Sequence, residues 1–345
     1  MKVDGIRIAG LGVYLPEPVS VERAVEEGLY DPVECEQSGW TGAAVAGDIS
    51  APDMAVLAAR QAMASSGHQA AEVDVVMHAS GYHQGPLMWS AHHYVQRHSI
   101  GGHAPALGVL QTCNGMLGAL ELACGYLALG DRTAALITGA DNFGTPLLNR
   151  WSYASGARTN RGSILGDAAA AMVVSRRSGF AELLAIGSMS LPDQEEMYRG
   201  DTPLFPPDAT VGRPVALGAR VAEFAARHPR EFAAAKEDLV KARVTLGERT
   251  LAEAGVEPGQ ITRATHVFSG GAEYIRSVLE PLGIDPARGV LDLGRSVGHL
   301  GVADHFVAFD HLVKTGRLGP GDHVMMISNG GGTTLSCAVL RMLEV

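Results

Sequence analysis

One cysteine in this sequence stands where a fold can turn it into a nucleophile. Cys113 follows a short apolar run at residues 108–110 and precedes a segment whose apolar residues recur near helical spacing up to Gly130. At such a strand-to-helix junction, the unpaired N–H groups of the first helical turn and the positive end of the helix dipole stabilise a thiolate. We therefore predict that Cys113 is a nucleophile; the alternative is a small buried residue without a chemical role.

The other cysteines and a group of histidines do not predict a metal site. Cys35, Cys124 and Cys337 form no Cys-x-x-Cys pair, and their spacing fits neither a zinc pattern nor a disulfide framework. We expect Cys124 and Cys337 to be buried packing residues. The histidines of the loop after residue 80 have no carboxylate or cysteine at ligand spacing, so surface or loop positions are expected for His83, His92, His93, His98 and His103.

Strands and helices alternate around Cys113, which is the pattern of an α/β fold. Helices are expected over residues 19–30 and 51–66, and the stretch 36–48 is predicted to be loop-rich. The order strand, helix, strand implies parallel pairing. The expected strands of this half are apolar runs bounded by turn residues, and they cover residues 6–14, 73–80, 108–110, 133–138 and 164–175.

The last hundred residues repeat the earlier order of elements. We expect a strand over 264–270, helices over 273–284 and 302–318, and two strands around a glycine turn within 321–342. The order helix, Gly-Asp turn, strand and glycine loop occurs in residues 122–144 and again in residues 309–332. The two segments read LACGYLALGDRTAALITGADNFG and FDHLVKTGRLGPGDHVMMISNGGG. This suggests a duplicated α/β half, with the first half at 1–180 and the second at 181–345.

An insertion of about residues 190–255 interrupts the second half. Residues 191–220 are rich in Pro, Asp and Gly without periodicity, and we expect a lid or insertion over the substrate side. Residues 222–254 are predicted to form two helices whose lysines and arginines lie among glutamates, which is typical of a solvated helix face.

Composition narrows the class of function. The chain has 345 residues, and 27 basic against 37 acidic residues give a net charge of −10 without a Lys/Arg cluster. Nucleic acid and anionic membranes are therefore poor partners. Charge and glycine interrupt the N-terminus before an apolar core forms, and no run of 18 apolar residues occurs, so we expect a cytoplasmic enzyme without a membrane span.

Four motifs in this order resemble the thiolase superfamily, and within it the third-type β-ketoacyl-acyl-carrier-protein synthases. They are the strand–Cys–helix unit at 110–123, LGDAAAAMVV at 165–174, GHLGVAD at 298–304 and GDHVMMISNGGGTTLSCAV at 321–339. The resemblance covers nearly the whole chain. It implies a thiolase-like fold with duplicated αβαβα architecture in five layers, a homodimer, and a cysteine acylated by coenzyme A or an acyl carrier protein. It implies no bound cofactor, since the coenzyme A or phosphopantetheine thioester is itself the acyl donor.

The sequence departs from this family where decarboxylative condensation is performed. Condensing members usually add a histidine in a His-Gln-Ala-Asn motif and an asparagine in a Gly-Asn loop. Here residues 267–272 read VFSGGA and residues 298–299 read Gly-His. Losing one of two preorganised donors to a malonyl enolate costs ~2.7–4 kcal/mol in barrier. Ser269 can supply a weak hydrogen bond at most, so the resemblance argues against an ordinary condensing site.

The departure suggests a different catalytic set. A histidine beside Cys113 is what plain acyl transfer needs, because it helps to form the thiolate and then deprotonates an incoming hydroxyl or amine. By its place in the matching loop, His299 is predicted to be this base and Asp304 to bind its second ring nitrogen. Two alternatives stay open: His299 only replaces the asparagine as a donor, or Asp304 only caps a helix.

Supporting roles are expected around this set. Asn329 and the glycines around Gly331 are expected to shape the loop beneath Cys113, whose own backbone N–H would provide the oxyanion hole, with Ser269 as a further donor. Three roles are open for Met88, Trp89 and Tyr94: they line an acyl pocket, pack in the core or form a dimer contact.

Three hypotheses for function follow. The favoured one resembles a branch of the family in natural-product pathways, such as polyketide and antibiotic biosynthesis: an acyltransferase that passes the acyl group from Cys113 to a hydroxyl or amine of a small-molecule acceptor. The alternative is a β-ketoacyl-acyl-carrier-protein synthase III that forms a carbon–carbon bond when loading a starter unit. The third is a non-catalytic dimer partner that retains only the fold.

Overall fold

A nine-stranded mixed sheet organises the chain. The computed structural model describes residues 1–152, 163–205, 215 and 217–344. The strand order is β5-β4-β6-β7-β1-β8-β11-β10-β9. The bounds of these strands are β1 (Arg7–Tyr14), β4 (Val73–Ser80), β5 (Ala106–Leu110), β6 (Ala134–Asp141), β7 (Ala168–Ser175), β8 (Ala181–Ser190), β9 (Ile261–His266), β10 (His323–Gly330) and β11 (Thr334–Met342).

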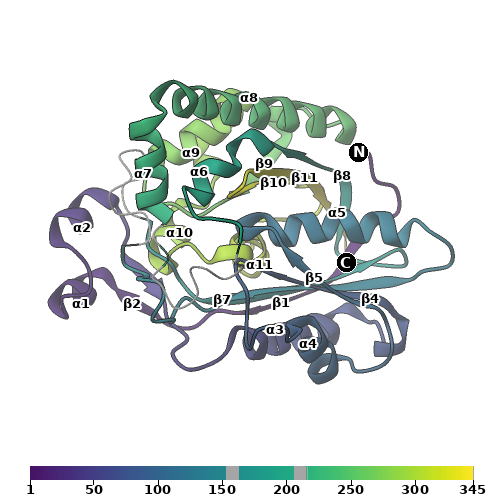
Figure 1. Ribbon diagram of the computed structural model, residues 1–345. Coiled ribbons are helices and arrows are strands. Elements are labelled where there is room, and N and C mark those ends of the chain that lie inside the picture. The colour runs from purple at the N-terminus through teal and green to yellow at the C-terminus, as the bar shows by residue number, and fades with distance from the viewer. Residues whose placement is uncertain (153–162, 206–214, 216, 345) are drawn as a thin grey trace.

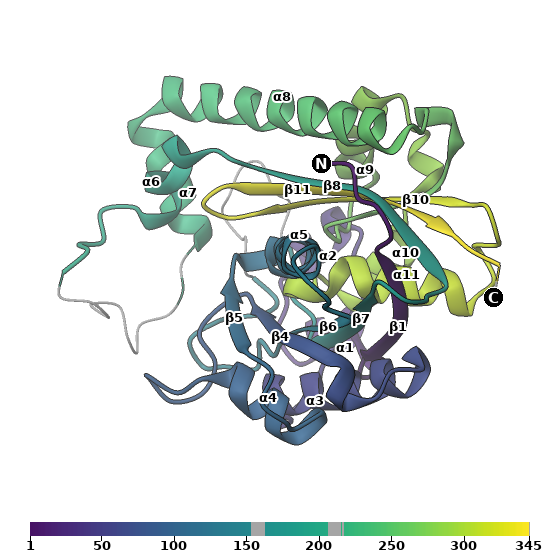
Figure 2. The ribbon, with the colours of Figure 1, turned by 90° about the vertical axis from the view of Figure 1, so that its right-hand side faces the viewer.

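The sheet bends into two layers at its middle. Strands β1 and β8 share only two residue pairs, Arg7 with Glu182 and Ile8 with Ala181. On one side of this junction lie β5, β4, β6, β7 and β1, and on the other lie β8, β11, β10 and β9. Figure 2 shows the two groups as separate layers with helices between them. β2 (Pro18–Ser20) and β3 (Gly42–Ala44) form a separate two-stranded sheet.

Helices form the other three layers. α3 and α4 cover the outer face of the first layer, α5 and α11 lie between the layers, and α8 and α9 cover the outer face of the second (Figure 1). The thiolase-like αβαβα architecture is thereby confirmed. The helices are α1 (Val21–Glu26), α2 (Pro32–Ser38), α3 (Ala51–Ser66), α4 (Ala91–Ser99), α5 (Gly115–Leu127), α6 (Glu195–Arg199), α7 (Leu217–Arg227), α8 (Pro229–Ala254), α9 (Ala272–Leu279), α10 (Leu291–Val297) and α11 (Asp304–Lys314).

The central helices α5 and α11 join the two sheet layers through shared apolar packing. α5 contributes Leu117 and Leu120, and α11 contributes Phe306 and Phe309, to one apolar cluster that also receives side chains from both sheet layers. All four side chains are fully buried. A helix that packs between two layers must be apolar over most of its circumference, and residues 115–127 are mostly apolar, with Leu122 exposed on the remaining side. The two central helices therefore begin inside the molecule, where a functional group at either start is shielded from water.

Several elements differ from the sequence-based expectations. Strand β8, which links the two layers, was not predicted, because polar and glycine residues interrupt its apolar pattern, AELLAIGSMS. The stretch 36–48, expected to be loop-rich, contains the end of α2 and strand β3, and the expected strand at 264–270 is instead Ile261–His266. The two helices expected over 222–254 are present as α7 and α8.

The stretch predicted to be a lid or insertion is only partly described, and its role as a lid stays a prediction. Within 191–220 the described part contains a 3-10 turn at Pro192–Gln194, the short helix α6 and the start of α7. Residues 206–214 and 216 lie outside the described residues. Within the described residues, none of the helices combines the length and apolar character needed to traverse a lipid bilayer.

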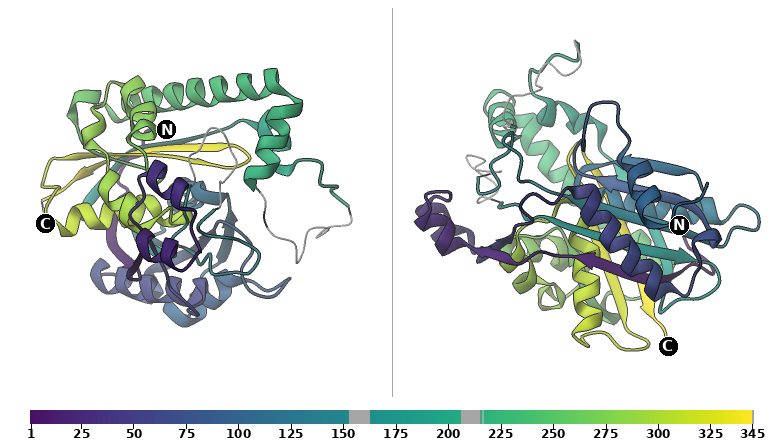
Figure 3. Two further views of the ribbon diagram at one scale, coloured as in Figure 1. Left: turned by 90° about the vertical axis from the view of Figure 1, so that its left-hand side faces the viewer. Right: turned by 90° about the horizontal axis from the view of Figure 1, so that it is seen from below.

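The N-terminal segment with α1 and α2 extends beyond the sheet (purple in Figure 3). Its strand β3 packs against α10, where Thr41 N donates to Arg295 O over 2.8 Å. The guanidinium of Arg295 in turn donates to Gly270 O over 2.8 Å. This segment therefore supports two loops that follow β9 and α10, close to the predicted histidine loop.

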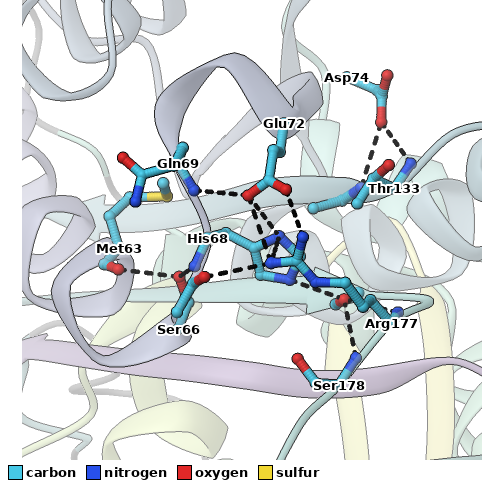
Figure 4. Close-up of polar contacts among 12 residues, drawn as sticks. Met63, Ser66, His68, Gln69, Glu72, Asp74, Thr133, Arg177 and Ser178 are labelled. Atoms are coloured by element: carbon cyan, nitrogen blue, oxygen red, sulfur yellow. Dashed lines mark hydrogen bonds and ion pairs between the residues drawn. The ribbon is translucent and has the colours of Figure 1, made fainter.

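A polar cluster closes the end of the sheet where β4 and β6 begin and β7 ends (Figure 4). We call His68, Glu72, Asp74 and Arg177 the basal cluster. Asp74 accepts hydrogen bonds from the backbone N–H groups of Thr133 (2.6 Å) and Ala134 (3.2 Å). Glu72 forms an ion pair with Arg177, and His68 Nε2 lies 2.8 Å from the hydroxyl of the last β7 residue.

Candidate active site

Cys113 lies in a tight turn between β5 and α5. The residues Thr112–Asn114 form a 3-10 turn, and Thr112 has φ +47°, in the left-handed region that non-glycine residues seldom adopt. The Cys113 carbonyl accepts a hydrogen bond from the Ser328 hydroxyl over 3.4 Å. Gly330 packs so closely that a Cβ there would lie 2.3 Å from Thr112 Oγ1. The glycine loop after β10 therefore fixes the backbone beside the cysteine.

His299 and Asp304 extend from Cys113 in one hydrogen-bonded chain. His299 Nε2 lies 2.9 Å from Cys113 Sγ. On the other side of the ring, His299 Nδ1 donates to Asp304 Oδ2 over 2.6 Å. His299 and Asp304 are buried, while Cys113 is half-buried. The structure thus brings together the three residues predicted to be catalytic, in the order nucleophile, imidazole, carboxylate.

The backbone of His299 is held by the segment before β7. His299 N donates to Ile164 O over 2.9 Å, and His299 O accepts from Gly166 N over 2.9 Å. A Cβ on Gly166 would lie 2.0 Å from Val297 O, so only glycine permits this approach. The Leu-Gly-Asp motif of residues 165–167 therefore clamps the histidine loop from the first half of the chain.

Asp304 is fixed by more than the histidine. Its Oδ2 also accepts from Phe268 N (2.8 Å), and its Oδ1 accepts from Leu300 N (2.7 Å). Although Asp304 is the first residue of α11, these bonds go to the loops before the helix. Its carboxylate therefore ties the imidazole to two loops.

The charge on this chain follows from its neighbours. Burial opposes a positive charge on His299, but the Asp304 carboxylate and the Cys113 sulfur outweigh it, so the pKa of His299 lies well above its ordinary 6.5. A protonated imidazole beside a sulfur favours the thiolate form of the pair. By contrast, burial raises the pKa of the Cys124 and Cys337 thiols to about 12. Both are buried, which confirms the prediction that they are packing residues.

The predicted supporting residues have other partners. Ser269 Oγ accepts a hydrogen bond from Gly271 N over 3.2 Å within its own loop. Asn329 Oδ1 accepts from the Tyr274 hydroxyl over 3.3 Å. At Gly331, a Cβ would lie 3.3 Å from ring carbons of Tyr198. Gly331 and Asn329 therefore adjoin the turn beside Cys113, whereas the Ser269 hydroxyl stabilises the start of α9.

Two tyrosines of the site were missed by sequence analysis. Tyr198 in α6 packs on the glycine loop, and its hydroxyl accepts from Thr333 Oγ1 over 3.4 Å. Tyr274 in α9 donates to Asn329. Burial is the main cause that raises the pKa of both hydroxyl groups, and the charge of Cys113 adds to it. Neither tyrosine lies in a motif, so no sequence signal pointed to them.

Two further histidines near Asp304 have structural partners. His266 Nδ1 donates to Val267 O over 2.9 Å, while its Nε2 accepts from Val290 N over 3.3 Å. His305 Nδ1 lies 2.9 Å from Thr265 Oγ1, and burial lowers the pKa of His305 to about 4. Both imidazoles are therefore neutral at physiological pH, since burial also lowers the pKa of His266.

The histidines of residues 83–103 lie at or near the surface as expected, but His92, His93 and His98 belong to helix α4 and not to the loop that was predicted there. His83, His93, His98 and His103 are exposed and His92 is half-buried. Across the part of the chain that the structure describes, no group of three or more His, Cys, Asp or Glu side chains is placed to hold a metal ion. Met88 is fully exposed and Trp89 is 37% exposed. Tyr94 donates from its hydroxyl to Asp53 over 2.7 Å at the surface.

Comparison with known proteins identifies the family. A family model described as 3-oxoacyl-[acyl-carrier-protein (ACP)] synthase III matches residues 108–190, and the model of its C-terminal part matches residues 251–342. The β-ketoacyl-[acyl-carrier-protein] synthase III of Caulobacter vibrioides is 26% identical over 350 residues, covering 97% of this chain and 99% of the relative.

Solved structures agree over the same length. ChlB3, described as an acyltransferase, is 42% identical, with a TM-score of 0.90 and coverage of 98% of both chains. The 3-oxoacyl-[acyl-carrier-protein] synthase III of Aquifex aeolicus VF5 has the same fold, with a TM-score of 0.77 at 21% identity and coverage of 97% of this chain and 99% of its own. The chain therefore belongs to the thiolase superfamily and, within it, to the 3-oxoacyl-[acyl-carrier-protein] synthase III family.

Proposed function

We propose that this protein is an acyltransferase that acts through an acyl-Cys113 intermediate. The donor is an acyl-CoA or acyl carrier protein thioester, and the acceptor is a hydroxyl or amine of a small molecule in a natural-product pathway. The observation that carries the proposal is the chain from Cys113 Sγ to His299 Nε2 (2.9 Å) and from His299 Nδ1 to Asp304 (2.6 Å). The 42% identity to ChlB3, described as an acyltransferase, supports it.

The first half-reaction acylates the cysteine. The Cys113 thiolate attacks the thioester carbonyl, and the backbone N–H of Cys113 stabilises the oxyanion, while Asn329 and Gly331 shape the surrounding loop. The carbon–sulfur bond of the donor then breaks. The departing thiolate takes the proton from the His299 imidazolium, which leaves acyl-Cys113 beside a neutral imidazole.

The second half-reaction transfers the acyl group. Neutral His299 removes the proton of the acceptor hydroxyl or amine as its oxygen or nitrogen attacks the acyl carbon. The bond between that carbon and Cys113 Sγ breaks, which restores the thiolate and imidazolium. Asp304 keeps the Nδ1 proton in place and stabilises the positive charge, because its carboxylate is held by Phe268 N and Leu300 N.

Carbon–carbon bond formation is the second candidate, because several relatives are named β-ketoacyl-acyl-carrier-protein synthases III. Decarboxylation of a malonyl thioester requires two donors at the developing enolate. The Ser269 oxygen accepts a bond from Gly271 N, so its hydroxyl can offer one donor at most, and both ring nitrogens of His266 are bonded to backbone groups. These contacts favour acyl transfer over condensation.

The exposed edge of the first sheet layer supports a homodimer. Strand β5 is the outermost strand, and it exposes Leu107 by 46% and Leu110 by 65%, while Leu122 of α5 is 56% exposed. An apolar edge strand in water invites pairing with another chain. We propose that a second copy covers this edge and contacts Met88 and Trp89. Sedimentation velocity of the purified protein is expected to give a dimer, and a monomer at micromolar concentration would contradict it. Location in the cytoplasm stays a prediction.

Intact-mass spectrometry tests the proposed chemistry. The protein is incubated with short acyl-CoAs and malonyl-CoA, in parallel with Cys113→Ala and Cys124→Ala. We expect an acyl adduct on the native chain and on Cys124→Ala, absent from Cys113→Ala and discharged by an alcohol acceptor. Discharge only by a malonyl carrier protein, with release of carbon dioxide, would establish the condensing enzyme instead. No adduct from any donor would favour the non-catalytic dimer partner.

A further inference from the structure

A buried carboxylate outside the predicted set contacts the histidine loop. Asp141 is the last residue of β6 and is 0% exposed. Its Oδ1 accepts from Gly81 N over 2.8 Å, just after the end of β4. Its Oδ2 accepts from Val302 N over 3.1 Å, in the turn between His299 and Asp304. Asp141 thus connects the sheet directly to the segment that carries the imidazole.

The contact between this carboxylate and the loop is close. Gly301 has φ +60°, and a Cβ at that position would lie 2.2 Å from Asp141 Oδ2. Only glycine can therefore bring the loop onto the carboxylate in this conformation. Gly301, directly before Val302, is thus the residue type that this contact requires.

We propose that Asp141 is a positioning residue, which holds the His299 loop against the sheet and supports with its negative charge the imidazolium paired with the Cys113 thiolate. The proposal rests on the proposed function, because it takes Cys113 and His299 as the reacting pair. It goes beyond that function, because it adds a second carboxylate that acts on His299 through the loop backbone and through space.

The electrostatic surroundings make the charge of Asp141 sensitive to pH. Burial raises the pKa of Asp141 to about 7, the bonds from Gly81 and Val302 and the charge of His299 oppose this rise, and Asp167 adds to it. Tyr82 is a further titratable group that faces it, and the pKa of Tyr82 is raised mainly by burial and then by the charge of Asp141.

Asp167 itself is paired with Arg150 at 2.9 Å. Its negative charge is therefore compensated, whereas Asp141 has only backbone N–H groups as direct partners among the described residues. Protonation of Asp141 would weaken the support of the His299 imidazolium. The imidazolium would then lose its proton at lower pH.

The basal cluster offers a matched control. Asp74 also accepts two backbone N–H bonds, from Thr133 and Ala134, and so ties the start of β6 to β4. Asp74 and Asp141 lie at opposite ends of neighbouring parallel strands. Replacing either with asparagine disturbs a carboxylate that holds backbone, but only Asp141 lies beside the histidine loop.

Alkylation of Cys113 by iodoacetamide tests the proposal without any acyl donor. The rate at each pH from 5 to 9 is followed by intact mass for the native chain, Asp141→Asn, Asp74→Asn and His299→Gln. For Asp141→Asn we expect the midpoint of the profile to move downward by on the order of half a pH unit or more, because removing a nearby negative charge lowers the pKa of the groups around it. Asp74→Asn is expected to keep the native midpoint even if its melting temperature falls.

The outcomes separate this proposal from the proposed function. A native midpoint in Asp141→Asn, with a shifted one in His299→Gln, would overturn the role of Asp141 alone. Identical profiles for the native chain and His299→Gln would overturn the Cys113–His299 pair itself. Should Asp141→Asn not fold, Asp141→Glu moves the carboxylate by one methylene and is expected to shift the midpoint in the same direction by less; an unshifted midpoint there would overturn the proposal.

Discussion

The two ends of the first sheet layer use the same chemical groups for different purposes. At the basal end, Asp74 accepts backbone hydrogen bonds from the start of β6 (Figure 4). At the other end, Asp141 accepts them from Gly81 and Val302. Each end also carries a histidine near a carboxylate, His68 with Glu72 and His299 with Asp304. Composition alone therefore does not distinguish the two ends.

Burial and the sign of the nearest charge do distinguish them. At the basal end, Glu72 and Arg177 are partly exposed, so water and each other compensate their charges. Burial, together with the charge of Arg177, lowers the pKa of His68. At the other end, the buried His299 has a carboxylate on one side and a sulfur on the other, and these raise its pKa in spite of burial. The two histidines therefore differ in their surroundings: His299 is buried between two negative partners, whereas His68 has a cation beside it.

The largest expected effect is the loss of the base. In His299→Ala, discharge of a preformed acyl-Cys113 to an alcohol should fall by about 10³-fold, within the range that a general base contributes. The matched change at the basal end, His68→Ala, should leave this rate unchanged. Single-turnover decay of the acyl adduct by mass spectrometry measures both. Equal decay in His299→Ala and the native chain would break the comparison.

A smaller loss is expected when the imidazole is kept but its partner is altered. Asp304→Asn removes the negative charge that fixes the Nδ1 proton, and the discharge rate should fall by about 10²-fold, the lower end of what a positioned acid–base group contributes. The rate should depend on pH differently, because the carboxylate that raises the pKa of His299 is absent. A pH–rate profile from 5 to 9 checks this. An unchanged profile would mean that Asp304 serves only the Phe268 and Leu300 backbone.

The two histidines should also give opposite pH dependences of stability. The pKa of His299 in the native state is above 6.5, so its contribution is fully present below pH 6.5 and is lost as pH rises through the native value. The pKa of His68 is below 6.5, so its contribution is present above pH 6.5 and is lost as pH falls through the native value.

Urea unfolding between pH 5 and 9 measures these contributions. Relative to the native chain, His299→Gln should lose a stabilisation that is larger at the acidic end of the range. His68→Gln should instead relieve a loss of stability at the acidic end. Curves that stay parallel to the native one in both variants would show that the two imidazoles do not differ in charge.

How far the sequence predicts this structure depends on how local each signal is. The helix over 51–66 and the strand over 73–80 were predicted with the observed bounds, because capping residues and apolar periodicity mark them locally. The five-layer fold rested on the motif order and is confirmed. Strand β8 was missed because its pairing with β1 and β11 decides its conformation, not its own pattern. The division into halves at 180 stays a prediction.

The candidate site was predictable only where a motif carried it. Cys113 at a helix start and His299 in its loop lie in motifs, and the structure places them 2.9 Å apart. Their catalytic roles stay predictions. Tyr274 and Asp141 lie in no motif that marks them, since their contacts join residues 55 and 161 positions apart. Such partners depend on the layers coming together, which no local pattern encodes.

The smallest expected effect lies at the basal end. Glu72→Gln removes the ion pair with Arg177 but keeps an oxygen that can accept from Gln69 N, as Glu72 does over 2.8 Å. Because both side chains are partly exposed, the loss in unfolding free energy should be small. Urea denaturation measures this loss. Glu195→Gln breaks the exposed pair with Arg199 within one helix and is the control, with a still smaller expected loss.

Acyl transfer should be unchanged in both variants. A drop in the transfer rate of Glu72→Gln would mean that the two ends of the sheet are energetically coupled, and that the basal cluster acts on the site through β4 and β6.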